Sequence, residues 1–313
     1  MTAALPLLSY QHAPMHTLAR LLILAALAHA TPSAAQSLPN EIVGHKIRLP
    51  GDKVEGTTEK LSEVERLLIE ALPPQQQAER LLQYAISHHV GATDEIKARV
   101  TEWRGAITQS PSMETLLDVA RNGADLRVRA AAIELELASM NIAKTAGQVD
   151  VLLARIAASP KDARSEIYTL GLLGNRGVET DRIHNELRAL AQSGEFIVRY
   201  QAYAAISNLG TDDSVADLVT AFHHDASTYV QINGGGCGLA HCGMLTRAQR
   251  MTAVPGLLEI AEDGTVDSVI QGYVYRALRE ITDENIPDDA QQWRVWYATK
   301  GAETLERFRK IEG

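Results

Sequence analysis

The chain has 313 residues, of which 45% are apolar and only 5% aromatic, and its formal net charge is −9. The apolar content is sufficient for a long buried core, and the scarcity of aromatic residues favours closely stacked helices rich in Ala and Leu. The acidic balance makes the chain a poor candidate for binding nucleic acid through bulk electrostatics, and no run of Lys and Arg is present.

The first 35 residues resemble an N-terminal extension followed by an export signal. From Met15, a short polar region precedes an apolar run at 21–28 and then small residues. This order is typical of a secretory signal, with cleavage expected after Ala30 or Ala35, and residues 1–14 then precede the functional start. The apolar run is too short to span a bilayer, so no membrane insertion is expected after cleavage. The alternative is a buried hydrophobic helix that begins a cytosolic domain.

Two further segments precede the main part of the chain. Residues 36–58 are rich in Pro and Gly without a helical period, which predicts an extended linker or arm. A helical pattern begins at residue 59, and three helices are expected within 59–109. Pro73 and Pro74 separate the first helix from the second, and the third runs over about 93–107. We interpret these helices as a cap on the array that follows.

His88 and His89 lie near the predicted end of the second helix and suggest a metal site. Neighbouring side chains on a helix point about 100° apart, so two adjacent histidines rarely bind one ion. A favourable interaction with the helix dipole is the preferred interpretation.

A regular array of helical pairs is predicted over residues 110–284. Ser110 can cap the first helix and Pro111 can take its first position. Each pair has a helix of about a dozen residues, a polar turn, and a longer Ala-rich helix. Arg129, Arg164 and Arg199 recur near the start of the second helices at equal spacings of 35 residues. We expect them to form a ladder of contacts with Asp or Glu of adjacent units; a row of ligand-binding arginines is the alternative.

The repeated units resemble bacterial HEAT-like repeats over about 110–298. The resemblance rests on the Ala-rich helices after Val128-Arg129, Ala163-Arg164 and Val198-Arg199, on the endings LGLLGNRG and AISNLG, and on the last unit, AVPGLLEIAEDGTVDSVIQGYVYRALREITDENI. It implies an all-α fold, a right-handed α-solenoid of stacked helical pairs. Members of this class act as scaffolds, inhibitors or accessory factors, and the phycobilisome-lyase relatives handle a chromophore. No residue here matches a motif that would transfer the lyase activity.

A C-terminal cap is predicted over residues 285–313. The stretch PDDAQQWRVWY resembles the Trp-bearing tail of exported members of the class. Asp288 or Asp289 can cap a helix that places Trp293 and Trp296 on one face, where they would cover the last repeat; stacking on a carbohydrate is the alternative. Tyrosines of the second helices are also expected to pack between helices rather than form an aromatic groove: Tyr200, Tyr203, Tyr273 and Tyr275.

The repeat pattern breaks at an irregular, Cys-bearing loop over residues 233–246. Consecutive Gly residues there make a helix improbable. The interval from Arg199 to Gln271 is 72 residues, about two repeats, so a unit is present but remodelled. The run GGGCG is weak evidence for phosphate binding, because no strand precedes it and the Lys of a P-loop is missing.

The only two cysteines, Cys237 and Cys242, lie in this loop, and an exported chain would place them in an oxidising compartment. A disulfide is the leading interpretation; closing so small a ring stabilises the fold by about 2 kcal/mol. The alternatives are a zinc or copper site of Cys237, His241 and Cys242, helped by His223 or His224, and a redox-active pair. The spacing departs from the Cys-x-x-Cys pattern of thiol oxidoreductases.

The sequence therefore predicts an exported, non-enzymatic scaffold or protein-binding module, periplasmic or secreted. Its partner would be another protein rather than nucleic acid, it would need no cofactor, and the disulfide loop and the concave surface are the candidate contact regions. Nucleophile elbow, P-loop, His-Glu-x-x-His and dinucleotide motifs are absent from the sequence. The alternative function is that of a metal-binding or redox protein centred on Cys237 and Cys242.

Overall fold

The computed structural model describes residues 60–312, and within them the chain is helical. The described residues contain no strand, only an isolated bridge between Lys60 and Val90. The prediction of an all-α fold is confirmed. The predicted export signal with its two cleavage sites and the predicted arm at 36–58 lie outside the described residues. None of the described helices is long and apolar enough to cross a membrane.

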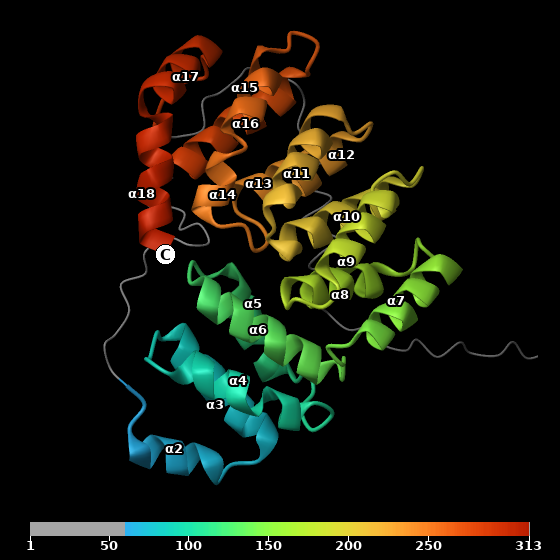
Figure 1. Cartoon of the computed structure of the whole chain (residues 1–313), viewed down its shortest axis with the longest axis vertical. Helices are drawn as coiled ribbons and strands as arrows, with labels where there is room; N and C mark the ends of the chain where they lie inside the picture. Colours follow the sequence, from blue (N-terminus) through green and yellow to red (C-terminus); the bar gives the residue numbers. More distant parts are fainter. Residues whose placement is uncertain (1–59, 313) are drawn as a thin grey trace, which may run out of the picture. The chain divides into compact units, whose positions relative to one another are not determined.

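Three helices precede the array, as predicted (Figure 1). Ser62 caps the first of them and forms a capping box with Glu65. Pro74 is the first residue of the second helix, where its missing N–H costs no hydrogen bond. The three helices are α2 (Glu63–Glu70), α3 (Pro74–Ile86) and α4 (Ala92–Trp103). The predicted apolar face of α2 is largely exposed, because Ile69 is its buried residue and the neighbouring leucines face outward.

Six helices then form three consecutive pairs, and this helical repeat-like fold confirms the predicted alternation (Figure 1). Within each pair the two helices contact each other, and the second helix of each pair contacts the second helix of the next. The pairs are α5 (Pro111–Asn122) with α6 (Leu126–Ser139), α7 (Ala146–Ala158) with α8 (Arg164–Asn175), and α9 (Thr180–Leu190) with α10 (Phe196–Leu209).

The ends of these helices follow the predicted capping chemistry. The Ser110 hydroxyl accepts a hydrogen bond from the Met113 amide at 3.1 Å, and Pro111 is the first residue of α5. Gly210 ends α10 with φ of 68°, a left-handed conformation that glycine adopts without steric cost. The predicted positions of Ser110 and Pro111 at the start of α5 are confirmed.

Helix α6 joins two clusters of core residues. Val128, Ala131 and Leu135 pack with the helices that precede α6, whereas Ile133 and Leu137 pack with the helices that follow it. Apolar side chains therefore surround α6 on most sides, as expected for an inner helix of a layered stack. The Ala-rich composition of the second helices reflects this burial on two faces.

The three equally spaced arginines do not form the predicted ladder. Arg199 pairs with a carboxylate of the next unit, because its Nε and Nη2 lie 2.8 and 2.9 Å from the two Asp225 oxygens. Arg129 is buried and donates to backbone carbonyls instead. Arg164 is exposed and is the first residue of α8, whereas the other two are the fourth residues of their helices. Equal spacing in sequence therefore does not give equal positions on the helices.

The glycine-rich stretch is helical, and the prediction that it interrupts the second helix is wrong. After α11 (Asp212–His224), the chain runs through α12 (Thr228–Val230), η2 (Gln231–Gly236), which is a π-helix, and α13 (Cys237–Ala240). η2 packs directly against α11. A Cβ atom at Gly235 would lie 2.5 Å from the Phe222 amide nitrogen and 2.7 Å from the Leu218 carbonyl oxygen. The close approach of η2 to α11 thus explains why glycine occupies position 235, although glycine disfavours a helix.

The last repeat-like pair and the C-terminal helices complete the described part of the chain. They are α15 (Val254–Glu262) with α16 (Ser268–Thr282), then α17 (Ala290–Trp296), the π-helical η3 (Tyr297–Gly301) and α18 (Ala302–Glu312). α17 contacts α15, and α18 contacts the short α14 (Arg247–Met251). Asp289 caps α17, and Trp293 is fully buried with its indole N–H donating to the Pro287 carbonyl at 3.0 Å. The predicted packing role of Trp293 is confirmed.

Candidate functional site

The two cysteines form a disulfide that links the first residue of α13 to the turn between α13 and α14. We call residues 237–246 the disulfide segment. The Cα atoms of Cys237 and Cys242 lie 5.4 Å apart, and the predicted pairing is confirmed. The amides of His241 and Cys242 both donate to the Cys237 carbonyl, at 3.0 and 2.8 Å. The disulfide and the backbone hydrogen bonds therefore close the same tight turn.

Arg250 on α14 holds the disulfide segment from the inside. Its side chain is fully buried, and its guanidinium donates to four carbonyl oxygens, at distances of 2.5 to 3.1 Å: Gly238, Leu239, Cys242 and Leu245. Hydrogen bonds from a charged donor are stronger than neutral ones, which makes this arginine a major contact of the turn. The sequence did not single out Arg250, because partners that are backbone carbonyls leave no pattern of residue types.

The disulfide segment also contacts helices far away in sequence. The Met244 amide donates to the Ser207 carbonyl near the end of α10 at 2.9 Å, and Arg129 on α6 donates to the Gly243 carbonyl at 2.5 Å. Gly243 has φ of 72°, and a Cβ there would overlap the Ser207 carbonyl. Glycine is therefore required at this position both by the backbone conformation and by the close approach of α10.

A pocket of about 280 Å³ lies where the disulfide segment meets the array. Its walls come from the end of α5, from α6, α8 and α10, and from the disulfide segment itself. The lining residues are Asp118, Arg121, Asn122, Arg129, Ile133, Tyr168, Leu172, Asn208, His241, Cys242, Gly243 and Met244. Polar and charged side chains from five elements thus line one small space, together with apolar ones, which makes this pocket a candidate site for a small polar group.

A partly buried charge network supports one wall of this pocket. Arg121 Nη1 lies 2.9 Å from Glu136 and 3.1 Å from the Tyr168 hydroxyl. Burial raises the pKa of Glu136 above its ordinary value, although hydrogen bonds from Arg121 and Tyr168 act in the opposite direction. Burial, together with the nearby Glu136 carboxylate, raises the pKa of Tyr168 to about 12. The charge of Arg121 is therefore offset within the wall.

His241 connects the disulfide to α16. Its Nδ1 lies 3.0 Å from a Glu280 carboxylate oxygen, and its Nε2 lies 3.5 Å from the Cys237 sulfur. The candidate ligand atoms of Cys237, His241 and Cys242 all lie within 4.8 Å of one another. His223, suggested from the sequence as a further ligand, instead contacts Asp263 at 3.0 Å and stacks on the ring of His224. Neither of these two histidines joins the group.

An exposed cluster of aromatic rings lies at the start of α10. We call Phe196, Tyr200 and Tyr229 the aromatic cluster. The Phe196 and Tyr229 rings meet edge to face with centroids 6.0 Å apart, and the Tyr200 ring lies 5.1 Å from that of Tyr229. Phe196 is 49% exposed and Tyr229 is 47% exposed. The bidentate Arg199–Asp225 ion pair fixes the α11–α12 turn to α10 beside this cluster.

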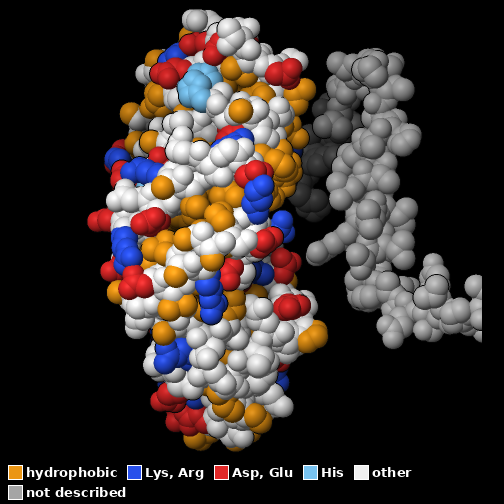
Figure 2. All heavy atoms as spheres, turned by 90° about the vertical axis from the view of Figure 1, so that its right-hand side faces the viewer, with side chains coloured by type: hydrophobic (Ala, Val, Ile, Leu, Met, Phe, Trp, Pro, Cys, Tyr) orange, Lys and Arg blue, Asp and Glu red, His pale blue; other side chains and the backbone are white. Residues whose placement is uncertain are grey.

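The four tyrosines predicted to pack between helices divide into two groups. Tyr203 and Tyr275 are buried, as predicted. Tyr200 is only half-buried and belongs to the aromatic cluster, and Tyr273 is 39% exposed. Tyr200 packs against the core with its buried part, so its predicted packing is confirmed in part. The prediction for Tyr273 is wrong, because this side chain faces solvent. Figure 2 shows exposed apolar side chains lying among acidic and basic ones on one face of the molecule.

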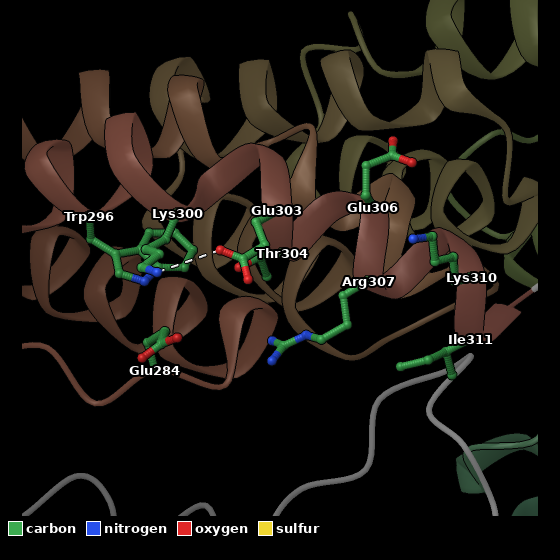
Figure 3. A pocket seen from close by; sticks show the side chains of 9 residues that line it. All are labelled: Glu284, Trp296, Lys300, Glu303, Thr304, Glu306, Arg307, Lys310 and Ile311. Atoms are coloured by element: carbon green, nitrogen blue, oxygen red, sulfur yellow. Dashed lines mark ion pairs between the residues drawn. The ribbon is translucent and has the colours of Figure 1, made fainter.

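A second, broader pocket of about 750 Å³ lies along α17, η3 and α18 (Figure 3). Three basic side chains and three acidic ones line it, together with Trp296, Thr304 and Ile311, so its charges balance. Lys300 pairs with Glu303 at 3.5 Å. Trp293 is buried and unable to stack on a sugar, whereas Trp296 is half-buried and lines this pocket. The polar side chains in Figure 3 do not point toward one common position, so this pocket is the weaker candidate site.

None of the family models, curated proteins or solved structures with which the chain was compared matches it.

Proposed function

We propose that this protein is an exported, non-enzymatic binding module of HEAT-like repeats, stacked as a right-handed α-solenoid, that recognises another protein through the aromatic cluster. The proposal rests mainly on one observation: two of the three rings of the cluster are exposed on a helical scaffold. Tyr, Trp and Phe are enriched at protein interfaces, because each ring supplies a large contact area at a small cost in side-chain entropy.

The surroundings of the cluster support a recognition role. Arg199 and Asp225 form a two-point ion pair in which both side chains are mostly buried, so the neighbouring α10 and α12 are held in a fixed relation. A rigid surface loses little entropy on binding, which favours affinity. An exposed edge-to-face aromatic group with such support is the arrangement expected at the centre of an interface.

The test is photo-crosslinking from position 229 in the organism that makes the protein. A photoreactive phenylalanine analogue replaces Tyr229, and its adducts are compared with those from Val151, an exposed apolar residue on α7. We expect one partner to be crosslinked from position 229 and not from position 151. Equal adducts from both positions would contradict the proposal.

Substitution provides the matched measurement. Phe196→Ser with Tyr229→Ser should weaken capture of the crosslinked partner by at least tenfold, because central aromatic residues dominate interface energetics. Val119→Ser with Val151→Ser removes two equally exposed apolar side chains elsewhere and should leave capture unchanged. The export part of the proposal is tested separately by N-terminal sequencing of the protein from cell fractions, with Thr31 or Gln36 expected as the first residue.

A second candidate function is metal binding by the reduced disulfide segment. The specific observation is that the Glu280 carboxylate accepts a hydrogen bond from His241 Nδ1, while Nε2 faces Cys237. A carboxylate that orients the far nitrogen of a histidine is a common support for a metal ligand. In the disulfide form the sulfurs are bonded to each other, so this function requires reduction to thiolates.

Cobalt titration of the reduced protein tests this second candidate. Thiolate ligation would give a charge-transfer absorption that the disulfide form lacks, and His241→Ala should weaken it. His224→Ala serves as the matched control, because this histidine lies outside the group. Absence of the absorption in the reduced protein would rule the site out.

A further inference from the structure

Arg129 carries a buried positive charge that faces the smaller pocket. Its side chain is only 5% exposed, and it lines the pocket formed by the disulfide segment and the array. Nε donates to the Gly123 carbonyl at 2.6 Å, and Nη1 donates to the Gly243 carbonyl at 2.5 Å. Among the residues that the structure describes, no carboxylate pairs with this guanidinium, and Nη2 makes no hydrogen bond.

The corresponding arginine of a later unit shows what this arrangement lacks. Arg129 and Arg199 are both the fourth residues of their helices, and each donates to the carbonyl six residues earlier, Gly123 or Ser193. Arg199 also holds the Asp225 carboxylate through two hydrogen bonds. At Arg129 carbonyl dipoles take the place of that carboxylate, so the charge is solvated but not neutralised.

An uncompensated charge at this depth is costly. Burial alone lowers the pKa of Arg129 to about 10, still well above neutral pH, so the side chain stays charged. Buried charges are ordinarily paired or bound to an ion. A negatively charged group in the adjoining pocket would supply the missing partner.

The other charged groups of the pocket limit the net charge of a ligand that can bind there. Arg121 is already offset by Glu136, His241 contacts Glu280, and Asp118 contributes a further carboxylate to the lining. Arg129 is therefore the one basic group of the lining without a carboxylate close to it within the described residues. A singly charged ligand balances it, whereas the second negative charge of a phosphate would have no basic partner in the pocket and would be repelled by Asp118.

Asn208 supplies a second recognition group. Its side chain is half-buried at the end of α10, lines the pocket, and makes no hydrogen bond to the part of the chain that the structure describes. Because Asn208 and Arg129 line the same pocket, their amide N–H₂ and guanidinium N–H₂ groups together offer donors for the two oxygens of a carboxylate.

We propose that the pocket between α6, α10 and the disulfide segment binds a monocarboxylate, held by Arg129 and Asn208. The carboxylate belongs either to a small organic acid or to a peptide, and a volume of about 280 Å³ accommodates a group of this size. The proposal does not depend on the aromatic cluster, which lies on other residues.

The test is an NMR titration of the full chain with acetate at constant ionic strength. The Arg129 side-chain Nε–H signal is assigned by its loss in Arg129→Gln. We expect a saturable shift of this signal with acetate and none with acetamide, which has the same shape without the charge. An equal response to both compounds, or no response to acetate, would overturn the proposal.

Substitutions distinguish specific acetate binding in the pocket from general electrostatic attraction of the anion to the protein. Binding by the variants is followed through the backbone amide signal of Gly243, which lines the same pocket. Arg129→Gln should weaken acetate binding by at least tenfold, and Asn208→Ala by about threefold to tenfold, as expected for losing one hydrogen bond. Arg127→Gln removes an exposed charge two residues away and should change binding less than twofold. Equal weakening by the changes at 127 and 129 would contradict a specific site. If Arg129→Gln does not fold, the acetate and acetamide arms with Asn208→Ala still decide.

Two further probes identify the source of the carboxylate. Inorganic phosphate should bind more weakly than acetate, and stronger phosphate binding would overturn the monocarboxylate assignment. A short peptide with a free C-terminus is compared with the same peptide as its C-terminal amide. Tighter binding of the free acid than of acetate supports a peptide ligand, and equal binding supports a small organic acid.

Discussion

Replacing Arg250 should destabilise the protein more than breaking the disulfide that its side chain underlies. The Arg250 guanidinium donates to four carbonyls of the disulfide segment, two of them in the buried Gly238 and Leu239. Hydrogen bonds from a charged donor contribute about 1.5–3 kcal/mol each. Counting only the two buried carbonyls, Arg250→Met should lower the free energy of unfolding by about 3–6 kcal/mol.

The disulfide contributes less on the same scale. Closing a ring as small as residues 237–242 reduces the entropy of the unfolded chain and stabilises the fold by about 2 kcal/mol. If Arg250 contributes more than the disulfide, the buried arginine is the contact that determines the conformation of the segment. The tight turn should persist after reduction, since the backbone hydrogen bonds to the Cys237 carbonyl and the Arg250 contacts remain.

Urea unfolding followed by far-ultraviolet circular dichroism measures both effects. The samples are the oxidised protein, the reduced protein, Arg250→Met and Arg155→Met. Arg155 is 63% exposed and lies 4.0 Å from Glu166, so its replacement should change the free energy of unfolding by less than about 0.5 kcal/mol. If reduction costs more than Arg250→Met, the disulfide rather than the buried arginine holds the segment, and the reasoning fails.

Three further perturbations test other parts of the fold. Gly235→Ala should destabilise by about 1–3 kcal/mol in the same urea assay, because its Cβ would collide with α11, whereas Gly264→Ala, with no atom within 4 Å, should be neutral. Burial alone would raise the pKa of Asp217, but hydrogen bonds from His184 and Arg188 outweigh it and hold that pKa below the ordinary 3.8. The stabilisation from Asp217 is therefore complete above pH 3.8 and is lost as the pH falls through the lower folded-state pKa. Asp217→Asn should make the free energy of unfolding depend less on pH in that range, and an unchanged pH dependence would refute the argument. Trp293→Ala should cost about 3–5 kcal/mol because the indole is fully buried, while Trp296→Ala should cost clearly less; calorimetry checks the order.

The sequence predicted the elements whose determinants are local. Ser110 with Pro111, and Asp289, specify helix starts through side-chain caps and backbone conformation, and the structure has each of them. The helical periodicity of the apolar residues predicted the helical pairs up to α10, because each helix has one side that faces the core. The disulfide was predictable from two cysteines a few residues apart.

Features that depend on packing between distant helices were not predictable from local pattern. Gly235 costs a helix conformational entropy when considered alone, and only the proximity of Phe222 on α11 shows why glycine is needed there. Arg250 and Arg129 bind backbone carbonyls, which every residue type carries. The aromatic cluster was not recognised, and only Tyr200 of its three residues was considered. The periodicity of apolar residues marks a helix face without showing whether another helix covers it.

The contact between Arg129 and Gly243 bears on the order of folding. Neighbouring pairs in a repeat array touch mainly through residues close in sequence, so such arrays can nucleate locally and extend unit by unit. The Arg129 hydrogen bond to Gly243 joins residues 114 positions apart. Closing so long a loop carries an entropy cost that must be met before the contact forms, so we expect the disulfide segment to dock late, after α6, α8 and α10 have assembled. That docking then couples the first unit of the array to the fourth, and local fraying at either place weakens the other.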